Sequence, residues 1–181
     1  TSPSIVGSYS DSVYLEGAWG IAYDAANGYV YVTATDSDAM TIIDVGSDPT
    51  SPSLVGSYSS STYLEGARGI AYDATNGYVY VAASASDRMT IIDVGSDPAN
   101  PSFKGSCLHT DLDDAHDIAF DATRGYVYVP GYATDTMTII DVRSDPTSPS
   151  RVGSYSSSPP AYLGGARGIA YDATNGYVYV A

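Results

Sequence analysis

Short runs of β-branched and aromatic residues, separated by turn residues, form the main pattern of the sequence. The runs 21–24 and 29–34 flank the pair Asn27-Gly28. An Asn-Gly pair between two such runs is a strong hairpin signal, because both residues tolerate a positive φ. Near-copies of the stretch begin at Gly69, Asp117 and Gly168. The pattern therefore predicts a β-hairpin that the chain uses four times.

Two further strands follow each of the first three hairpins. The third is M-T-I-I-D-V at 40–45, and the fourth is S-L-V-G-S-Y at 53–58. The prolines between them cannot lie inside a hydrogen-bonded ladder, so they mark a connection. No helical periodicity of useful length is present. The chain is predicted to be all-β.

The four-strand unit recurs at a fixed interval. Pro3, Pro52, Pro101 and Pro149 occupy equivalent positions, which are 49, 49 and 48 residues apart. Four-stranded repeats of this length are typical of β-propeller blades. We predict one propeller domain over 1–181, or part of one, with the last repeat incomplete. Its repeats are 1–49, 50–98, 99–146 and 147–181.

The strands are not present in equal numbers. The third strand occurs three times, whereas the other three strands occur four times. Propellers usually close by completing one blade from both chain ends, which would pair 4–9 with the last hairpin. The strand that belongs between them is absent. Three explanations are open: the natural chain is longer, a neighbouring molecule supplies the edge, or one blade stays short. An open edge favours self-association.

The net charge of the chain excludes some classes of binding partner. The chain has 21 acidic and 7 basic residues, giving a net charge of −14. Such a field repels nucleic acid and anionic membranes, so neither is an expected partner. The 18 tyrosines suit half-buried strand surfaces, and no apolar run is long enough to span a membrane. Cys107 is the only cysteine, so no intrachain disulfide can form.

The third and fourth strands carry a family resemblance. The stretch I-I-D-V-G-S-D-P-T-S-P-S-L-V-G-S-Y at 42–58 resembles the LVIVD repeat, with a second copy at 139–155 and a weaker one at 91–107. The hairpin G-Y-V-Y-V-A is similar to the YVTN-type repeats of archaeal and bacterial surface proteins. The resemblance implies a secreted or cell-surface propeller, mostly without known catalysis. Localisation outside the cell or on its surface is the corresponding expectation.

One position varies among copies that otherwise agree. It lies at the start of each first strand, which in a propeller lines one mouth of the central channel, and it is occupied by Trp19, Arg68, His116 and Arg167. Arg and Trp are favoured anchors in binding interfaces, and strand ends on a rigid scaffold commonly carry function. We predict a patch here for a protein or glycan partner; unconstrained drift of exposed positions is the alternative.

The third repeat departs most from the others. Cys107, both histidines and four aspartates lie within 107–117. Imidazole and carboxylate groups bind Zn²⁺ and related ions, and alternate spacing would place 107, 109, 111 and 113 on one face of an extended segment. The candidate ligands for a divalent metal, Zn or Ca, are His109, Asp111, Asp113 and His116. The alternative is a solvated loop in which Cys107 simply packs.

Other aspartates recur at strand ends, at 24, 73, 121 and 172 and at 44, 93 and 141. Regular recurrence favours turn capping over catalysis, because active sites are asymmetric. No G-x-S-x-G elbow, phosphate loop or nucleotide fingerprint occurs, and no catalytic residue is predicted.

Three hypotheses for function follow. The first is a non-catalytic propeller module of an exported or cell-surface protein that acts in adhesion, envelope structure or binding. The second is a metal-binding or hydrolytic propeller enzyme with its site in the third repeat. The third is a structural subunit of an extracellular filament or layer. The sequence favours the first.

Overall fold

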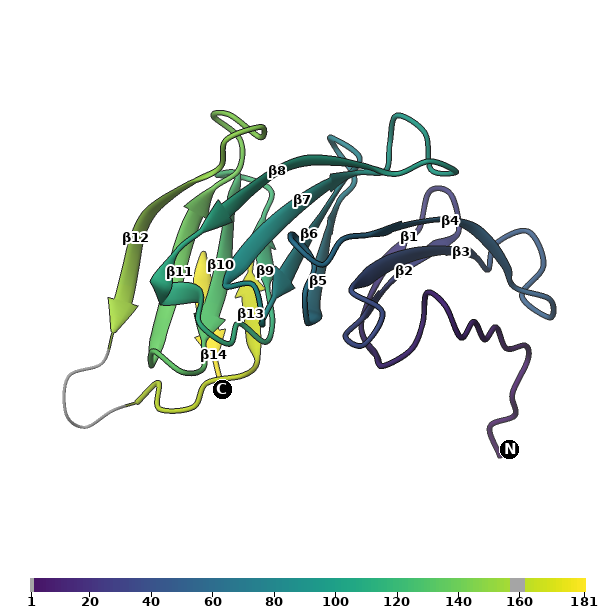
Figure 1. Cartoon of the computed structure of the whole chain (residues 1–181), viewed down its shortest axis with the longest axis horizontal. Helices are drawn as coiled ribbons and strands as arrows, with labels where there is room; N and C mark the ends of the chain where they lie inside the picture. Colours follow the sequence, from purple (N-terminus) through teal and green to yellow (C-terminus); the bar gives the residue numbers. More distant parts are fainter. Residues whose placement is uncertain (1, 157–161) are drawn as a thin grey trace.

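The structure, a computed structural model, describes residues 2–156 and 162–181. It consists of three four-stranded antiparallel sheets and one two-stranded hairpin, in which strands follow one another in chain order (Figure 1). We name them blades A to D. Blade A contains β1 (Ala18–Asp24), β2 (Tyr29–Ala34), β3 (Ala39–Asp44) and β4 (Ser53–Ser59). Blade B contains β5 (Ala67–Asp73), β6 (Tyr78–Ala83), β7 (Arg88–Asp93) and β8 (Ser102–Leu108).

Blade C contains β9 (Ala119–Asp121), β10 (Tyr126–Gly131), β11 (Thr136–Asp141) and β12 (Ser150–Ser156), and blade D contains β13 (Ile169–Asp172) and β14 (Tyr177–Val180). A single 3-10 turn, η1 (Thr110–Leu112), precedes β9. The all-β prediction and the four-stranded repeat are confirmed. Each sheet straddles two sequence repeats, because its fourth strand comes from the start of the next repeat.

The hairpins form where the sequence predicts, but Gly28, and not Asn27, adopts a positive φ, and residues 25–28 link the paired ends Asp24 and Tyr29. Gly28 has a φ of 70°, and the Gly28 amide donates to the Asp24 carbonyl, which closes the hairpin between β1 and β2. The Asp24 carboxylate caps the same turn by accepting from the Ala26 amide at 2.9 Å. The recurrent aspartates at strand ends are therefore capping residues, as their regularity suggested.

The hydrophobic core lies between the blades rather than within them. Val79, Val81 and Ile92 of blade B face blade A, where they pack in a cluster with Tyr31 and Ile42. The alternate residues of blade B face the other way and belong to a second cluster, shared with blade C, that includes Tyr80, Met89, Ile91, Val129 and Ile140. Successive side chains along a strand point to opposite faces of the sheet, so one sheet contributes to two hydrophobic clusters. Blade B is the central layer of the structure.

Outer strands also contact the following blade. A Cβ atom at Gly56 in β4 would lie 2.3 Å from the Pro98 carbonyl oxygen of blade B, and one at Gly105 in β8 would lie 2.3 Å from that of Pro146 in blade C. Gly7 makes the same close approach to Pro49. The segment 4–9 therefore occupies the place of an outer strand beside blade A, although it belongs to no sheet.

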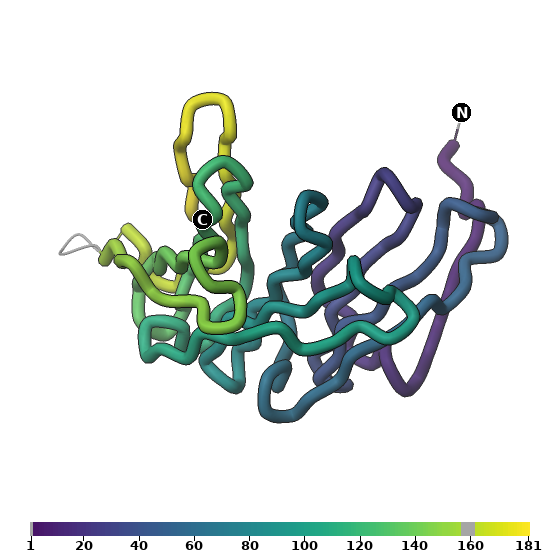
Figure 2. Tube along the Cα trace, turned by 90° about the horizontal axis from the view of Figure 1, so that it is seen from above, coloured from purple at the N-terminus to yellow at the C-terminus, as the bar shows by residue number. Residues whose placement is uncertain are grey.

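The usual propeller closure, in which 4–9 would complete the blade of the last hairpin, does not occur among the described residues. The two ends of the described chain lie far apart in both views, and β14 pairs only with β13 (Figure 2). Since the strand that belongs between them is missing, no ladder can connect the two segments. The blades form an open arc. No helix among the described residues has the length and apolarity to cross a membrane.

Candidate functional site

The first strands of the blades approach one another at their starting ends. A Cβ atom at Gly20 would lie 2.3 Å from the Arg68 carbonyl oxygen, and one at Gly69 would lie 2.4 Å from the Asp117 Cα. Only glycine permits backbones to pass this closely. The residues that precede these glycines, Trp19 and Arg68, are consequently held side by side. We call the region around them the channel mouth.

Arg68 is the centre of the channel mouth. Its Nη1 donates to Asp114 Oδ1 at 2.6 Å and lies 2.6 Å from His116 Nε2. Its guanidinium carbon lies 5.4 Å from the centroid of the Trp19 ring, within the range of a cation–π interaction. The structure therefore brings three of the four predicted residues into one cluster.

The fourth predicted residue joins through an aromatic ring. The Arg167 guanidinium lies 4.6 Å from the centroid of Tyr132, and the Tyr132 and His116 rings are 5.4 Å apart. Arg167 makes no ion pair with any residue that the structure describes. Its positive charge is available to a partner.

The environment of His116 favours the neutral imidazole. It is only 7% exposed, and burial, followed by the charge of Arg68, holds its pKa below the ordinary value. Because a guanidinium can only donate, the ring nitrogen that faces Arg68 must accept. Protonation of His116 would place two cations in contact.

The channel mouth contains a hollow of about 350 Å³. Its lining includes Trp19, Gly69, His116, Asp117 and Arg167. Trp19 is 58% exposed, so its indole presents an apolar surface beside the Arg167 cation. The arrangement can hold a partner that offers an acidic group next to an apolar one.

Sequence reasoning missed three residues of the channel mouth. Tyr132 follows β10, and no feature of the sequence pointed to it as a site residue. Asp114 and Asp117 belong to the divergent third repeat, where Asp114 has a φ of 52° and Asp117 stands in the glycine position. Asp117 Oδ2 accepts from the Ile169 amide of blade D at 3.0 Å. Comparison with the other repeats could have suggested Asp117 as an interblade contact.

The predicted metal ligands do not gather into one site, although His109 Nδ1 lies 3.6 Å from Asp111 Oδ1. His109 caps η1, its Nδ1 accepting from the Asp111 amide at 3.0 Å, while the Asp111 carboxylate accepts from Arg151 at 2.8 Å. His116 instead faces Arg68. Within 2–156 and 162–181, no group of three or more His, Cys, Asp or Glu side chains is placed to hold a metal ion.

The spacing that suggested those ligands assumed an extended segment, and this assumption is wrong. The chain leaves β8 at Leu108 and turns through η1, so residues 109, 111 and 113 do not share a strand face. Cys107 is buried in the core between blades B and C, and burial raises the pKa of its thiol. The packing alternative holds for Cys107.

The sequence matches a model of the LVIVD repeat three times, at residues 20–60, 72–109 and 114–157, which is more than half of the chain. No curated protein matches the sequence.

Several solved structures share the fold at low sequence identity. A protein from Lactobacillus plantarum is 14% identical, with a TM-score of 0.76 over 91% of this chain and 50% of its own. A protein of unknown function from Desulfotomaculum acetoxidans is 17% identical, with a TM-score of 0.68 over 87% of this chain and 49% of its own. The periplasmic gluconolactonase of Pseudomonas aeruginosa is 13% identical, with a TM-score of 0.65 over 77% of this chain and 39% of its own. The chain spans about half the length of the first two structures.

Proposed function

Because the chain belongs to the LVIVD repeat family and has a β-propeller fold, we propose that it is a non-catalytic binding module of an exported or cell-surface protein. In this proposal the channel mouth holds an acidic group of a protein or glycan partner. Fold alone does not define function, so the proposal depends on the site.

One observation carries the proposal. A position that differs in chemical type among otherwise similar repeats is also one whose side chains meet in space. Trp19, Arg68 and His116 form one cluster, and Arg167 reaches it through Tyr132. The close approach of the first strands brings these positions together, and the unlike residues at them make the cluster asymmetric. A site assembled from unlike residues of several blades fits recognition of one asymmetric partner.

The charges indicate the type of partner. Arg68 is occupied by Asp114, whereas Arg167 has no acidic neighbour within ion-pair distance among the described residues. The molecule as a whole carries −14, which opposes long-range attraction of anions. Recognition of an acidic group would therefore depend on direct contact with Arg167 and on burial of apolar surface against Trp19.

The enzyme hypothesis has less support. Its proposed ligands are directed to other partners, and likeness to a gluconolactonase at 13% identity concerns the fold only. Export rests on the resemblance to surface-protein repeats, and gene sequence flanking these residues would test it through an export signal or anchor. The filament hypothesis predicts assemblies larger than the 18.8 kDa chain, which light scattering would detect.

Binding to immobilised acidic peptides, basic peptides, sialylated glycans and neutral glycans tests the proposal. We expect the wild-type protein to retain an acidic probe. Trp19→Ala and Arg167→Ala should each weaken this binding at least about tenfold, the effect of losing an interface anchor. Lys104→Ala removes one positive charge from the outer strand β8 and should leave binding unchanged.

Two results would count against the proposal. One is equal binding of all probes by the wild type and the two channel-mouth variants. The other is hydrolysis of lactones or esters that disappears in His116→Ala, which would support the enzyme hypothesis.

A further inference from the structure

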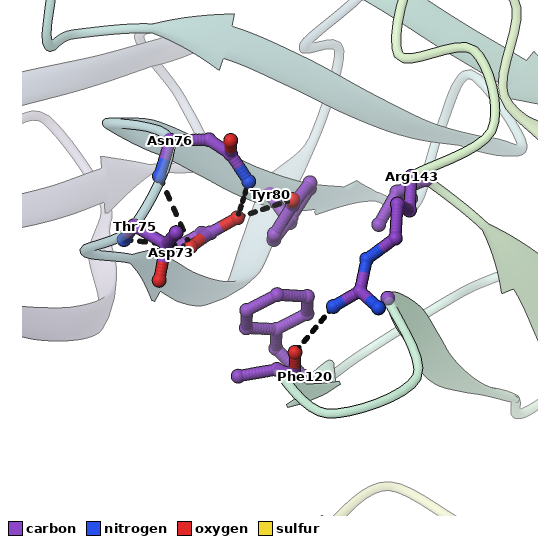
Figure 3. Close-up of a pocket in the computed structure, with 9 residues that line it drawn as sticks. Asp73, Thr75, Asn76, Tyr80, Phe120 and Arg143 are labelled. Atoms are coloured by element: carbon purple, nitrogen blue, oxygen red, sulfur yellow. Dashed lines mark hydrogen bonds between the residues drawn. The ribbon is translucent and has the colours of Figure 1, made fainter.

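A second cavity lies between blades B and C, at the opposite ends of the first strands from the channel mouth (Figure 3). It has a volume of about 370 Å³. Asp73, Asn76 and Tyr80 line it from blade B, and Phe120 and Arg143 line it from blade C. We call it the B–C cavity. The proposed function does not involve it.

The junction between blades A and B provides an internal reference. There Asp24 Oδ2 accepts from Asn27 Nδ2 at 2.7 Å, from Tyr31 at 3.4 Å and from Tyr72 at 3.1 Å. Asp24 is 1% exposed, so these donors replace water around a buried carboxylate. The Tyr72 hydroxyl comes from the next blade and completes the set.

At the B–C junction this third donor is missing. Asp73 is 2% exposed, and its Oδ2 accepts from Asn76 at 2.8 Å and from Tyr80 at 3.2 Å. Phe120 stands where blade B has Tyr72, and its ring packs on Tyr80 at 4.9 Å as Tyr72 packs on Tyr31 at 4.8 Å. Phe120 thus keeps the aromatic ring of Tyr72 but lacks its hydroxyl. Asp73 Oδ2 therefore accepts from two side chains, where Asp24 Oδ2 accepts from three.

A second substitution adds a cation to the same cavity. Arg143 occupies the position that Gly46 and Gly95 hold in blades A and B. Its Nη1 donates to the Thr123 carbonyl at 2.8 Å and its Nη2 to the Ala122 carbonyl at 2.5 Å. These bonds use two of the five guanidinium N–H groups, and the remaining three have no partner among the described residues. Arg143 is fixed across the cavity from Asp73 (Figure 3).

We propose that the B–C cavity binds a neutral monosaccharide unit. One sugar hydroxyl donates to Asp73 Oδ2, in the role that the Tyr72 hydroxyl has toward Asp24. Another accepts from Arg143, and the apolar face of the sugar packs against Phe120. Asp73 and Arg143 balance each other in charge, and the net charge of −14 opposes an anionic ligand. The volume is at the low end of the range for small-molecule sites.

Titration of the full chain with D-glucose, D-galactose, D-mannose and N-acetylglucosamine, followed by NMR, tests the proposal. We expect saturable shifts with at least one sugar, centred on residues of the B–C junction. Phe120→Tyr and Arg143→Gly should each reduce affinity at least tenfold. Both variants introduce the residue that the chain itself uses at an equivalent position, so folding should be preserved. Trp19→Ala at the channel mouth should have no effect.

The A–B junction allows the reverse experiment. Its equivalent cavity, lined by Asn27, Tyr31, Tyr72 and Gly95 among others, has a volume of about 250 Å³. The double variant Tyr72→Phe/Gly95→Arg should create a second site and raise the stoichiometry from one to two. Absence of saturable binding in the wild type would overturn the proposal. So would binding that both Phe120→Tyr and Arg143→Gly leave unchanged.

Discussion

Single side chains in this fold owe their ionisation state to neighbours from another blade. Burial, followed by the charge of Arg68 in the second repeat, lowers the pKa of His116 in the third. For Asp24, burial alone would raise the pKa, but hydrogen bonds from Asn27, from the Ala26 amide and from Tyr72 together lower it. Changes of pH therefore act on the contacts between blades.

Lowering the pH from 7.5 to 5.5 should destabilise the protein through His116. Its pKa is lower when folded than the unfolded value of about 6.5, so the unfolded chain binds the proton more readily below that pH. The contribution of neutral His116 to the free energy of unfolding is fully present above about pH 6.5. As the pH falls from there to the folded pKa, this contribution decreases by at most about 1.4 kcal/mol per pH unit. Urea unfolding at several pH values measures this slope.

The variant His116→Asn should lose the pH-dependent component attributed to this residue. His109→Asn keeps an acceptor at the cap of η1 and serves as the matched control, since it should retain the slope. An unchanged slope in His116→Asn would show that other groups cause the effect.

The Tyr72 hydroxyl should stabilise the A–B junction measurably. Tyr72→Phe removes one of the three donors to Oδ2 of the buried Asp24 carboxylate, and hydrogen bonds to charged groups are worth about 1.5–3 kcal/mol. We expect a loss of stability in that range at pH 7. The lowered pKa of Asp24 contributes stability that is present above about pH 4 and lost as the pH falls through the folded pKa, so the difference should shrink in acid. Thermal unfolding at pH 7 and pH 3 tests both parts.

At the scale of elements, the blades depend on glycines that admit a neighbouring backbone. Gly56 in β4 and Gly153 in β12 occupy the same position in successive copies of the fourth strand. A Cβ atom at Gly56 would meet the Pro98 carbonyl oxygen of the next blade at 2.3 Å, whereas nothing described lies within 4 Å of one at Gly153. The same residue type is under different constraints in the two strands.

Replacing these two glycines by alanine should give effects of opposite sign. Gly56→Ala forces the outer strand away from blade B and should cost about 1–3 kcal/mol. Gly153→Ala should be neutral or stabilise by up to about 1 kcal/mol, because alanine loses less backbone entropy in a strand. Chemical denaturation compares the two directly. If both variants destabilised the protein equally, the close approach to Pro98 would not be the reason why position 56 requires glycine.

The strands were predictable because their signals are local. The Asn-Gly turn, the proline connection and the M-T-I-I-D-V run each define an element within a few residues, and β2 coincides with the predicted run 29–34. The four channel-mouth positions were found from variation among repeats. Tyr132 was not, because its contact with His116 depends on how one blade is placed beside the next. The metal hypothesis assumed an extended 107–113, which the turn at η1 interrupts.

At the scale of the whole molecule, the blades differ in how much of their surface is packed against neighbouring blades. Blade B contributes one strand face to each hydrophobic cluster, with Ile92 in the first and Ile91 in the second. Blade D contacts a neighbour on one side, and Tyr177 and Tyr179 of β14 remain 62% and 57% exposed. In a repeat array, stability is approximately a sum of unit and nearest-neighbour terms. Opening free energies should therefore differ from blade to blade.

Native-state hydrogen exchange should reveal this order. We expect the slowest exchange in β6 and β7, whose side chains are covered from both directions. The fastest strand exchange should occur in β14, whose outer edge has no ladder partner among the described residues. Ile91→Val, which deletes one methylene in the core between blades B and C, should accelerate exchange in β10 more than in β2, while Ile92→Val should do the reverse. Uniform acceleration of all strands by either variant would show that the blades unfold as a single cooperative unit. Different responses in β2 and β10 would show that each interblade core stabilises its own pair of blades. The channel mouth contains residues from several blades, so its structure would then depend on every junction that it spans.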